Sequence, residues 1–126
     1  METLRHLVFA TDAWVIRTIL DEPRPYARLG LPHTAYPRDG AAAIGIDLDA
    51  QPSFDEVLEV RTDRMAVVRR IVDELTESEV ARACTRPPAP GYPDEPNTVG
   101  ECLRVVMGEE CEHHRYATRD LAVLEA

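Results

Sequence analysis

The sequence predicts an all-α fold, an up-down helical bundle with three long helices, one short helix and a long crossover loop. Three observations predict it. Apolar residues recur every three or four positions in three long segments, and helix-capping sequences precede three helical segments. Aromatic residues make up only 6% of the chain, so the core must consist mostly of aliphatic side chains. With 126 residues, the chain fits a single domain spanning 1–126.

The first helix is expected over residues 2–20, where an apolar stripe at helical spacing includes His6. Two prolines shortly after this segment end it. The connection 21–52 is rich in Pro and Gly and is long for a loop inside a compact domain. We expect it to be either a lid over a site or a crossover that packs along the bundle. The alternation of apolar residues over 44–48 indicates a short strand-like contact.

The later helices are marked by capping boxes, in which Ser or Thr precedes Glu by three positions. These boxes are Ser53–Glu56, Thr76–Glu79 and Thr98–Glu101. The helices that follow them are expected over 54–75, 77–84 and 99–125. A loop with five prolines, residues 85–97, separates the last two.

Composition narrows the possible partners. The net charge is −9 and every basic residue is Arg, so binding to a phosphate backbone through a basic face is disfavoured and no nucleic-acid partner is expected. No apolar stretch is long enough to span a membrane, and the first residues do not resemble a signal peptide. The three cysteines (Cys84, Cys102 and Cys111) are odd in number and form no Cys-x-x-Cys pair. This pattern is typical of a reducing compartment, so we expect a cytoplasmic protein.

The last helix carries the residues with the clearest chemical potential. One row along it is mostly apolar and comprises Leu103, Met107, Glu110, His114, Ala117, Leu121 and Leu124. Glu110 and His114 lie one turn apart in this row, and a carboxylate in a core is costly unless it is paired or binds a metal. His6 lies on an apolar stripe of another helix. Two histidines and one carboxylate form the ligand set of many zinc and open iron sites, so His6, Glu110 and His114 are candidate metal ligands.

Two alternatives remain open from the residues alone. Glu110 and His114 could form a buried hydrogen-bonded pair that binds no metal. The sequence has two adjacent glutamates and two adjacent histidines, so it does not decide which Glu-x-x-x-His pair is the ligand pair. Glu109 and His113 have the same spacing on the adjacent, more polar row. The apolar character of its row favours the first pair.

Two segments resemble the DinB-like superfamily: ETLRHLVFATDAW near the start and ECLRVVMGEECEHHRYATRDLAVLE at the end. Members are four-helix bundles, many of them with a metal site between helices. The family pattern has one His in an early helix and His-x-x-x-His, or in one branch Glu-x-x-x-His, in the last helix. His6 matches the first element, and Glu110 with His114 matches the Glu variant of the second.

The resemblance implies a thiol-dependent enzyme, because characterised relatives include maleylpyruvate isomerases and S-transferases that use mycothiol, bacillithiol or glutathione. A divalent ion, with zinc preferred over nickel or iron, would activate a low-molecular-weight thiol or a water. Glu109 or His113 would orient a ligand or move a proton. Arg115 and Arg119 would hold an anionic small-molecule substrate, unless they are simply solvated.

The resemblance also bears on assembly. Family bundles usually have a helix before the one that bears the first His, whereas this chain begins five residues before His6. We therefore expect a homodimer in which the partner covers the open face. The alternative to an enzyme is a non-catalytic binding or stress-response bundle whose polar or metal site is vestigial or structural.

Overall fold

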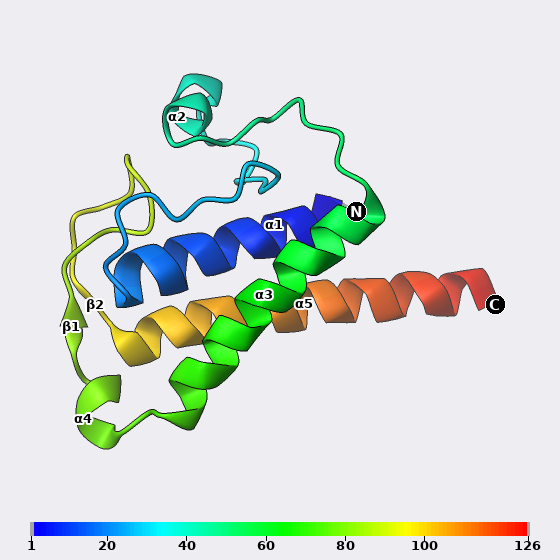
Figure 1. The fold of residues 1–126 in the computed structure, drawn as a ribbon. Helices are drawn as coiled ribbons and strands as arrows, with labels where there is room; N and C mark the ends of the chain where they lie inside the picture. The colour runs from blue at the N-terminus through cyan, green and yellow to red at the C-terminus, as the bar shows by residue number, and fades with distance from the viewer. Residues whose placement is uncertain (1, 126) are drawn as a thin grey trace.

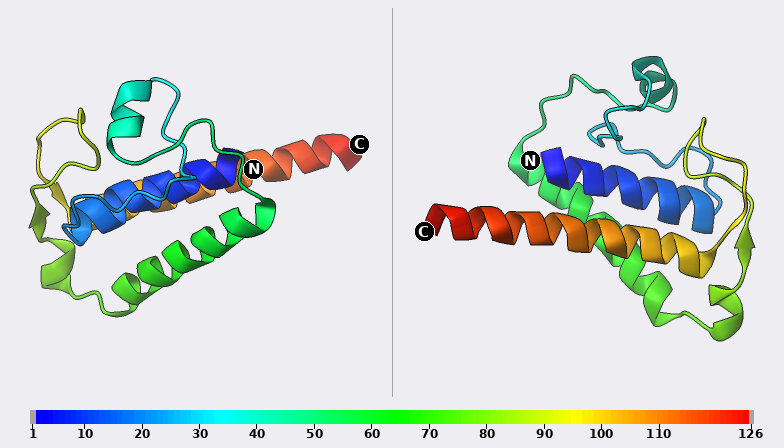
Figure 2. Two further views of the ribbon diagram at one scale, coloured as in Figure 1. Left: turned by 45° about the horizontal axis from the view of Figure 1, so that its top comes forward. Right: turned by 180° about the vertical axis from the view of Figure 1, so that it is seen from behind.

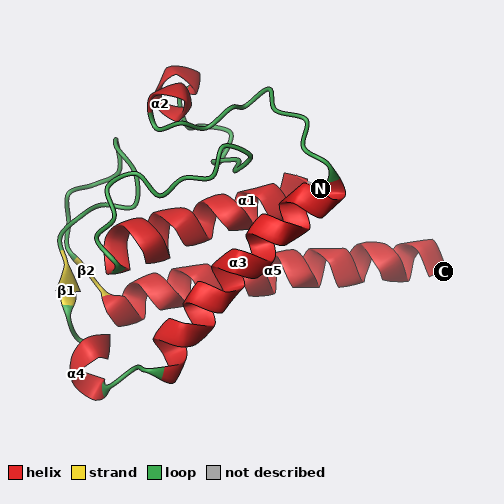
Figure 3. Ribbon diagram, in the orientation of Figure 1, coloured by secondary structure: helices red, strands yellow, loops and turns green. Residues whose placement is uncertain are grey.

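The structure is a computed structural model that describes residues 2–125, with side chains for residues 2–112. Its elements are α1 (Glu2–Thr11), η1 (Asp12–Ile19), α2 (Arg38–Ala43), α3 (Phe54–Asp73), α4 (Glu77–Val80), β1 (Ala83–Cys84), β2 (Asn97–Thr98) and α5 (Val99–Glu125). The ribbon is almost entirely helix and loop (Figure 3), which confirms the all-α fold class. None of the helices in the described part of the chain is both long and apolar enough to cross a membrane.

Three long helical segments make up the bundle: α1 continued by η1, α3, and α5 (Figure 1). α1 packs against both α3 and α5, and η1 packs against α5. α1 and α3 run in the same direction and α5 runs opposite to both, as two further views also show (Figure 2). The crossover 21–52 makes this possible, because it carries the chain back from the end of η1 to the start of α3. The far part of α5 extends beyond the other helices (Figure 2).

The predicted helix starts are confirmed by their capping contacts. Ser53 Oγ accepts a hydrogen bond from the Glu56 amide at 3.1 Å, and the Glu56 side chain reaches back to the Ser53 amide. Thr76 and Thr98 accept in the same way from the amides three residues later, at 3.2 and 3.1 Å. Each contact satisfies an amide that the helix itself leaves without a partner.

The second half of the first helix has more residues per turn than the periodicity predicted. From Asp12 onward it is a π-helix, with hydrogen bonds that span five residues. The Leu20 amide donates to the Val15 carbonyl at 3.0 Å, and Thr18 Oγ1 donates to the Ala13 carbonyl at 3.2 Å. An apolar stripe defines a helix but does not distinguish a turn of 3.6 residues from a slightly wider one.

Two local predictions were wrong. The helix expected over 77–84 ends at Val80, because Ala83–Cys84 instead pairs antiparallel with Asn97–Thr98 across the Pro-rich loop. Residues 44–48 form turns and no strand, with Gly45 at φ 88°, a left-handed conformation that favours glycine. The alternating apolar residues there point into a core without any partner strand.

The core has two parts. The first lies between η1, α3, β1 and the start of α5, and it contains Val15, Ile19, Val68, Cys84, Val99, Cys102, Leu103 and Val106. The second lies under the crossover and contains Phe9, Ala13, Tyr36, Ala41, Ile44, Ile46 and Ala89. The crossover therefore packs along α1. This agrees with the expectation of a crossover that packs along the bundle.

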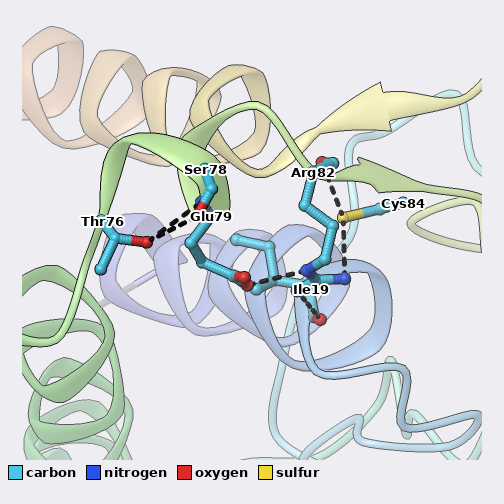
Figure 4. A network of polar contacts seen from close by, with 6 residues as sticks. All are labelled: Ile19, Thr76, Ser78, Glu79, Arg82 and Cys84. Carbon is cyan, nitrogen blue, oxygen red and sulfur yellow. Dashed lines mark hydrogen bonds and ion pairs between the residues drawn. The ribbon is translucent and has the colours of Figure 1, made fainter.

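Arg82, which lies between α4 and β1, links this part of the chain to the end of η1 (Figure 4). The Arg82 guanidinium donates to the Ile19 carbonyl at 3.0 Å and to Glu79 Oε1 at 2.7 Å. It also lies 3.8 Å from the Cys84 sulfur. The Ile19 carbonyl is at the last turn of the π-helix, so Arg82 supplies a donor that the helix end lacks.

A buried ion pair joins the first helix to α3 and to the crossover. Asp12, at the junction of α1 and η1, is fully buried. Its carboxylate accepts from Arg64 Nε at 2.5 Å and from the Ala27 amide at 2.9 Å. Burial raises the pKa of the Asp12 carboxyl, and these two hydrogen bonds offset part of that rise.

Removing Arg64 is expected to be strongly destabilising, because Asp12 would keep a buried charge without its counter-ion or would have to be protonated. Arg64→Met should lower the free energy of unfolding by about 3 kcal/mol or more. Arg69→Met, at an exposed position of the same helix, is the matched control and should change it by about 0.5 kcal/mol or less. Urea unfolding followed by circular dichroism measures both, and equal losses would contradict a special role for the ion pair.

The three cysteines differ in reactivity. Cys84 and Cys102 are buried in the first core, whereas Cys111 is exposed on α5. Burial raises the pKa of the Cys84 thiol, and it raises the pKa of the Cys102 thiol to about 12. Since the thiolate is the reactive form, both buried thiols should be inert at neutral pH.

Iodoacetamide at pH 8 should therefore label Cys111 alone in the folded protein and all three cysteines in denaturant. Peptide mapping by mass spectrometry gives the extent of labelling at each position. Labelling of Cys102 at the rate of Cys111 in the native protein would mean that the first core is open in solution.

Candidate metal centre

His6 connects three separate parts of the chain. It lies in the second turn of α1, and its Nε2 atom is 3.2 Å from Glu109 Oε2 on α5. Its Nδ1 atom is 3.0 Å from the Leu31 carbonyl oxygen in the crossover. The His6 side chain is 24% exposed and that of Glu109 36%, so the pair lies at the edge of the bundle where a small molecule could reach it.

Both ring nitrogens of His6 therefore face an acceptor oxygen. A neutral imidazole has one N–H, so it can donate to the Leu31 carbonyl or to Glu109 but not to both. If Nδ1 donates to the carbonyl, the lone pair of Nε2 points toward the Glu109 carboxylate. That arrangement is favourable when a proton or another cation lies between the nitrogen and the oxygen.

The two atoms also fit the geometry of a shared metal ion. Zinc binds histidine nitrogen and carboxylate oxygen at about 2.0–2.2 Å, so two ligand atoms on a tetrahedral ion lie about 3.3 Å apart. The 3.2 Å between His6 Nε2 and Glu109 Oε2 is close to that spacing. The Leu31 carbonyl matches the outer partner that metal-binding histidines usually have on their other nitrogen. A divalent metal therefore fits this donor pair.

Glu110 points to a different helix. Its two carboxylate oxygens each accept a hydrogen bond from the Arg61 guanidinium of α3, both at 2.5 Å. This bidentate pair is largely shielded, with Arg61 16% and Glu110 26% exposed. The planar guanidinium and the carboxylate match in geometry, so the contact fixes α3 against α5.

The buried face of α5 differs in part from the predicted one. Cys102 and Val106 are buried at 0% and 3% exposure, whereas Met107 is 52% exposed. The expectation that the row containing Leu103, Met107 and Glu110 forms the buried face was wrong at Met107, whereas Leu103 of that row is buried. The row of Cys102, Val106 and Glu109 continues instead toward His6.

The remaining predicted residues lie on α5 beyond the described side chains. They are His113, His114, Arg115 and Arg119. Their proposed roles stay predictions. α5 is continuous through these positions, so His113 follows Glu109 by one turn on the same helix face, as His114 follows Glu110. Among residues with described side chains, no group of three or more His, Cys, Asp or Glu is gathered closely enough to hold a metal.

Sequence reasoning missed Tyr92, an aromatic side chain whose hydroxyl is affected by the charge of Glu109. Burial raises the pKa of the Tyr92 hydroxyl, and the negative charges of Tyr36 (when ionised) and of Glu109 raise it further. Tyr92 comes from the Pro-rich loop, and its ring packs edge-on against Trp14 at 6.2 Å. The signal in the sequence was a single aromatic residue among several prolines. The position of the Tyr92 side chain, however, depends on how the Pro-rich loop folds back onto the bundle.

The family model described as the DinB superfamily matches residues 1–117. The match covers the helix that bears His6, the crossover, and α5 through both Glu-x-x-x-His pairs. No curated protein and no solved structure matches the chain.

Proposed function

Because the chain belongs to the DinB superfamily, we propose that it is a metal-dependent enzyme whose centre is built on His6, Glu109 and His113. The observation that carries the proposal is the approach of His6 Nε2 to Glu109 Oε2 between α1 and α5. His113, one turn beyond Glu109, would complete a set of two histidines and one carboxylate. Zinc is the proposed metal, with nickel or iron as alternatives.

The contacts of the two glutamates support this choice of register. Glu110 is engaged by Arg61 through both oxygens, and withdrawing it would leave a shielded guanidinium without its partner. Glu109 already faces the histidine of the first helix. Glu110 with His114 remains the rival ligand pair, and it would require Glu110 to leave Arg61.

The proposed chemistry is transfer or isomerisation that uses a low-molecular-weight thiol, or hydrolysis. A divalent metal bound here would lower the pKa of a coordinated thiol or water and so provide a nucleophile at neutral pH. The protein's own contribution is positional. The Leu31 carbonyl orients the His6 ring, and the Arg61–Glu110 pair holds α5 in the register that presents Glu109. Arg115 and Arg119 are proposed to bind an anionic group of the substrate.

A second candidate function follows from the same contact. If His6 is an imidazolium, it can donate to both Leu31 and Glu109, and the centre is then an ion pair that ties α1 to α5. In that case the chain is a binding bundle with a structural polar pair and no metal.

The two overlapping Glu-x-x-x-His pairs serve as controls for each other in a test of metal binding. Metal content of purified, untagged protein is measured by inductively coupled plasma mass spectrometry, after loading with zinc and desalting. Wild type, Glu110→Gln and His114→Ala should retain close to one equivalent. His6→Ala, Glu109→Gln and His113→Ala should each lose most of it, because each removes one of three ligands.

The opposite pattern, with loss in Glu110→Gln and His114→Ala alone, would establish the rival register. A wild-type protein that holds no zinc would refute the enzyme proposal and leave His6 and Glu109 as a structural ion pair. Circular dichroism of every variant separates loss of metal from loss of fold.

We also propose that the chain forms a homodimer. Phe54 and Leu58 lie one turn apart on α3 and are 55% and 38% exposed, and Met107 on α5 is 52% exposed. Apolar side chains grouped on one helix face favour association.

Light scattering coupled to size-exclusion chromatography should give twice the 14.1 kDa of one chain. Substituting Phe54 and Leu58 together by Glu should shift the mass to that of a monomer. The same two changes made one turn apart at exposed positions of α3, as Thr62→Glu and Ala66→Glu, serve as the matched control and should leave the mass unchanged. A monomeric wild type would contradict the proposal.

A further inference from the structure

We propose that a groove between the crossover and the Pro-rich loop binds an uncharged, apolar part of the substrate, preferably an aromatic ring. The inference rests on the proposed function, because it assigns this groove to the substrate of the His6–Glu109 centre. It adds a binding site and a chemical class of ligand that the metal centre does not specify.

The groove has a size suited to a small molecule. Its volume is about 590 Å³, within the range of roughly 300–1,000 Å³ that is usual for ligand sites. One wall comes from the crossover and the start of α2, and the other from the Pro-rich loop. Side chains that line it include His33, Ala35, Tyr36, Pro37, Tyr92 and Pro93.

The lining favours an uncharged ring. The rings of His33, Tyr36 and Tyr92 stand 6.0–6.4 Å from one another at tilted or edge-on angles. Such rings offer both faces and edges to another aromatic group. Among the described side chains, no carboxylate and no guanidinium lines the groove, so a charged group placed there would lose its water without gaining a permanently charged partner.

The two walls are held in place before any ligand binds. Proline carbonyls of the Pro-rich loop accept hydrogen bonds from side chains of the opposite segments. Arg17 donates to the Pro87 carbonyl at 2.6 Å, Tyr36 donates to the Pro90 carbonyl at 3.0 Å, and Tyr26 donates to the Pro88 carbonyl. A preformed groove loses less conformational entropy on binding than a flexible one.

The groove is separate from the metal centre, because neither His6 nor Glu109 is among its lining residues. A series of ring contacts leads from one to the other: His6 lies 6.4 Å from Phe9, and Phe9 lies 6.3 Å from Tyr36, which forms part of the groove. From the opposite wall, the charge of Glu109 raises the pKa of the Tyr92 hydroxyl. A molecule with an apolar ring in the groove could thus present its reactive end to His6 and Glu109.

The test uses N-phenyl-1-naphthylamine, an uncharged aromatic probe that fluoresces in apolar surroundings, titrated into the full-length protein. The variants are Ala35→Glu, which places a carboxylate in the groove, and Ala43→Glu, which makes the same change at an exposed position of α2 outside it. Wild type and Ala43→Glu should bind the probe saturably with one site and equal affinity. Ala35→Glu and Tyr92→Ser should each weaken binding at least tenfold.

Absence of saturable binding by wild type, or equal weakening by Ala35→Glu and Ala43→Glu, would overturn the inference. Zinc content is measured on the same preparations. Ala35→Glu that keeps zinc but loses the probe supports a groove distinct from the metal ligands. Probe binding by a wild type that holds no zinc would refute the proposed function, and with it the assignment of the groove to that substrate. Zinc binding without probe binding would refute the groove alone.

Discussion

The structure depends on the neutralisation of one buried carboxylate, that of Asp12. A charge at this depth is tolerated only with strong donors around it, and those donors come from α3 through Arg64 and from the crossover through the Ala27 amide. One side chain therefore fixes the first helix, the third helix and the start of the crossover relative to one another. The crossover then continues to Leu31, whose carbonyl holds the ring of His6. The proposed metal ligand thus contacts the same crossover that Asp12 holds at Ala27.

The Pro-rich loop shows how a segment with few backbone N–H donors can be ordered. Proline has no N–H to donate, so the loop offers mainly carbonyl oxygens, and these are used as acceptors by Arg17, Tyr26 and Tyr36. The loop is also anchored at its ends, where β1 pairs with β2. Both effects place Tyr92 against Trp14, and the charge of Glu109 raises the pKa of the Tyr92 hydroxyl. Two irregular segments far apart in sequence consequently form one apolar groove.

The register of α5 determines which of two similar motifs faces the first helix. The helix buries Cys102 and Val106, and Glu109 follows on that face, while Glu110 turns toward α3 and meets Arg61. The two glutamates are neighbours in sequence, yet they take part in different interactions because adjacent helical positions differ by about 100° around the axis. Glu110 supports the packing of α5 against α3, and Glu109 contacts His6 on α1.

The sequence by itself determined the all-α class, the three long helices, the capped starts at Ser53, Thr76 and Thr98, and His6 with a Glu-x-x-x-His pair as the residues to examine. These features are local, because helical periodicity and capping depend on residues within one or two turns. Only the tertiary structure decided the π-helical turn after Thr11, the pairing of β1 with β2, and the contact of Glu109 with His6 where Glu110 had been expected. The pairing of β1 with β2 and the contact of Glu109 with His6 depend on partners far along the chain, as does the pairing of Glu110 with Arg61. Periodicity ranks the faces of a helix by apolar content, but the neighbouring helices decide which face is buried.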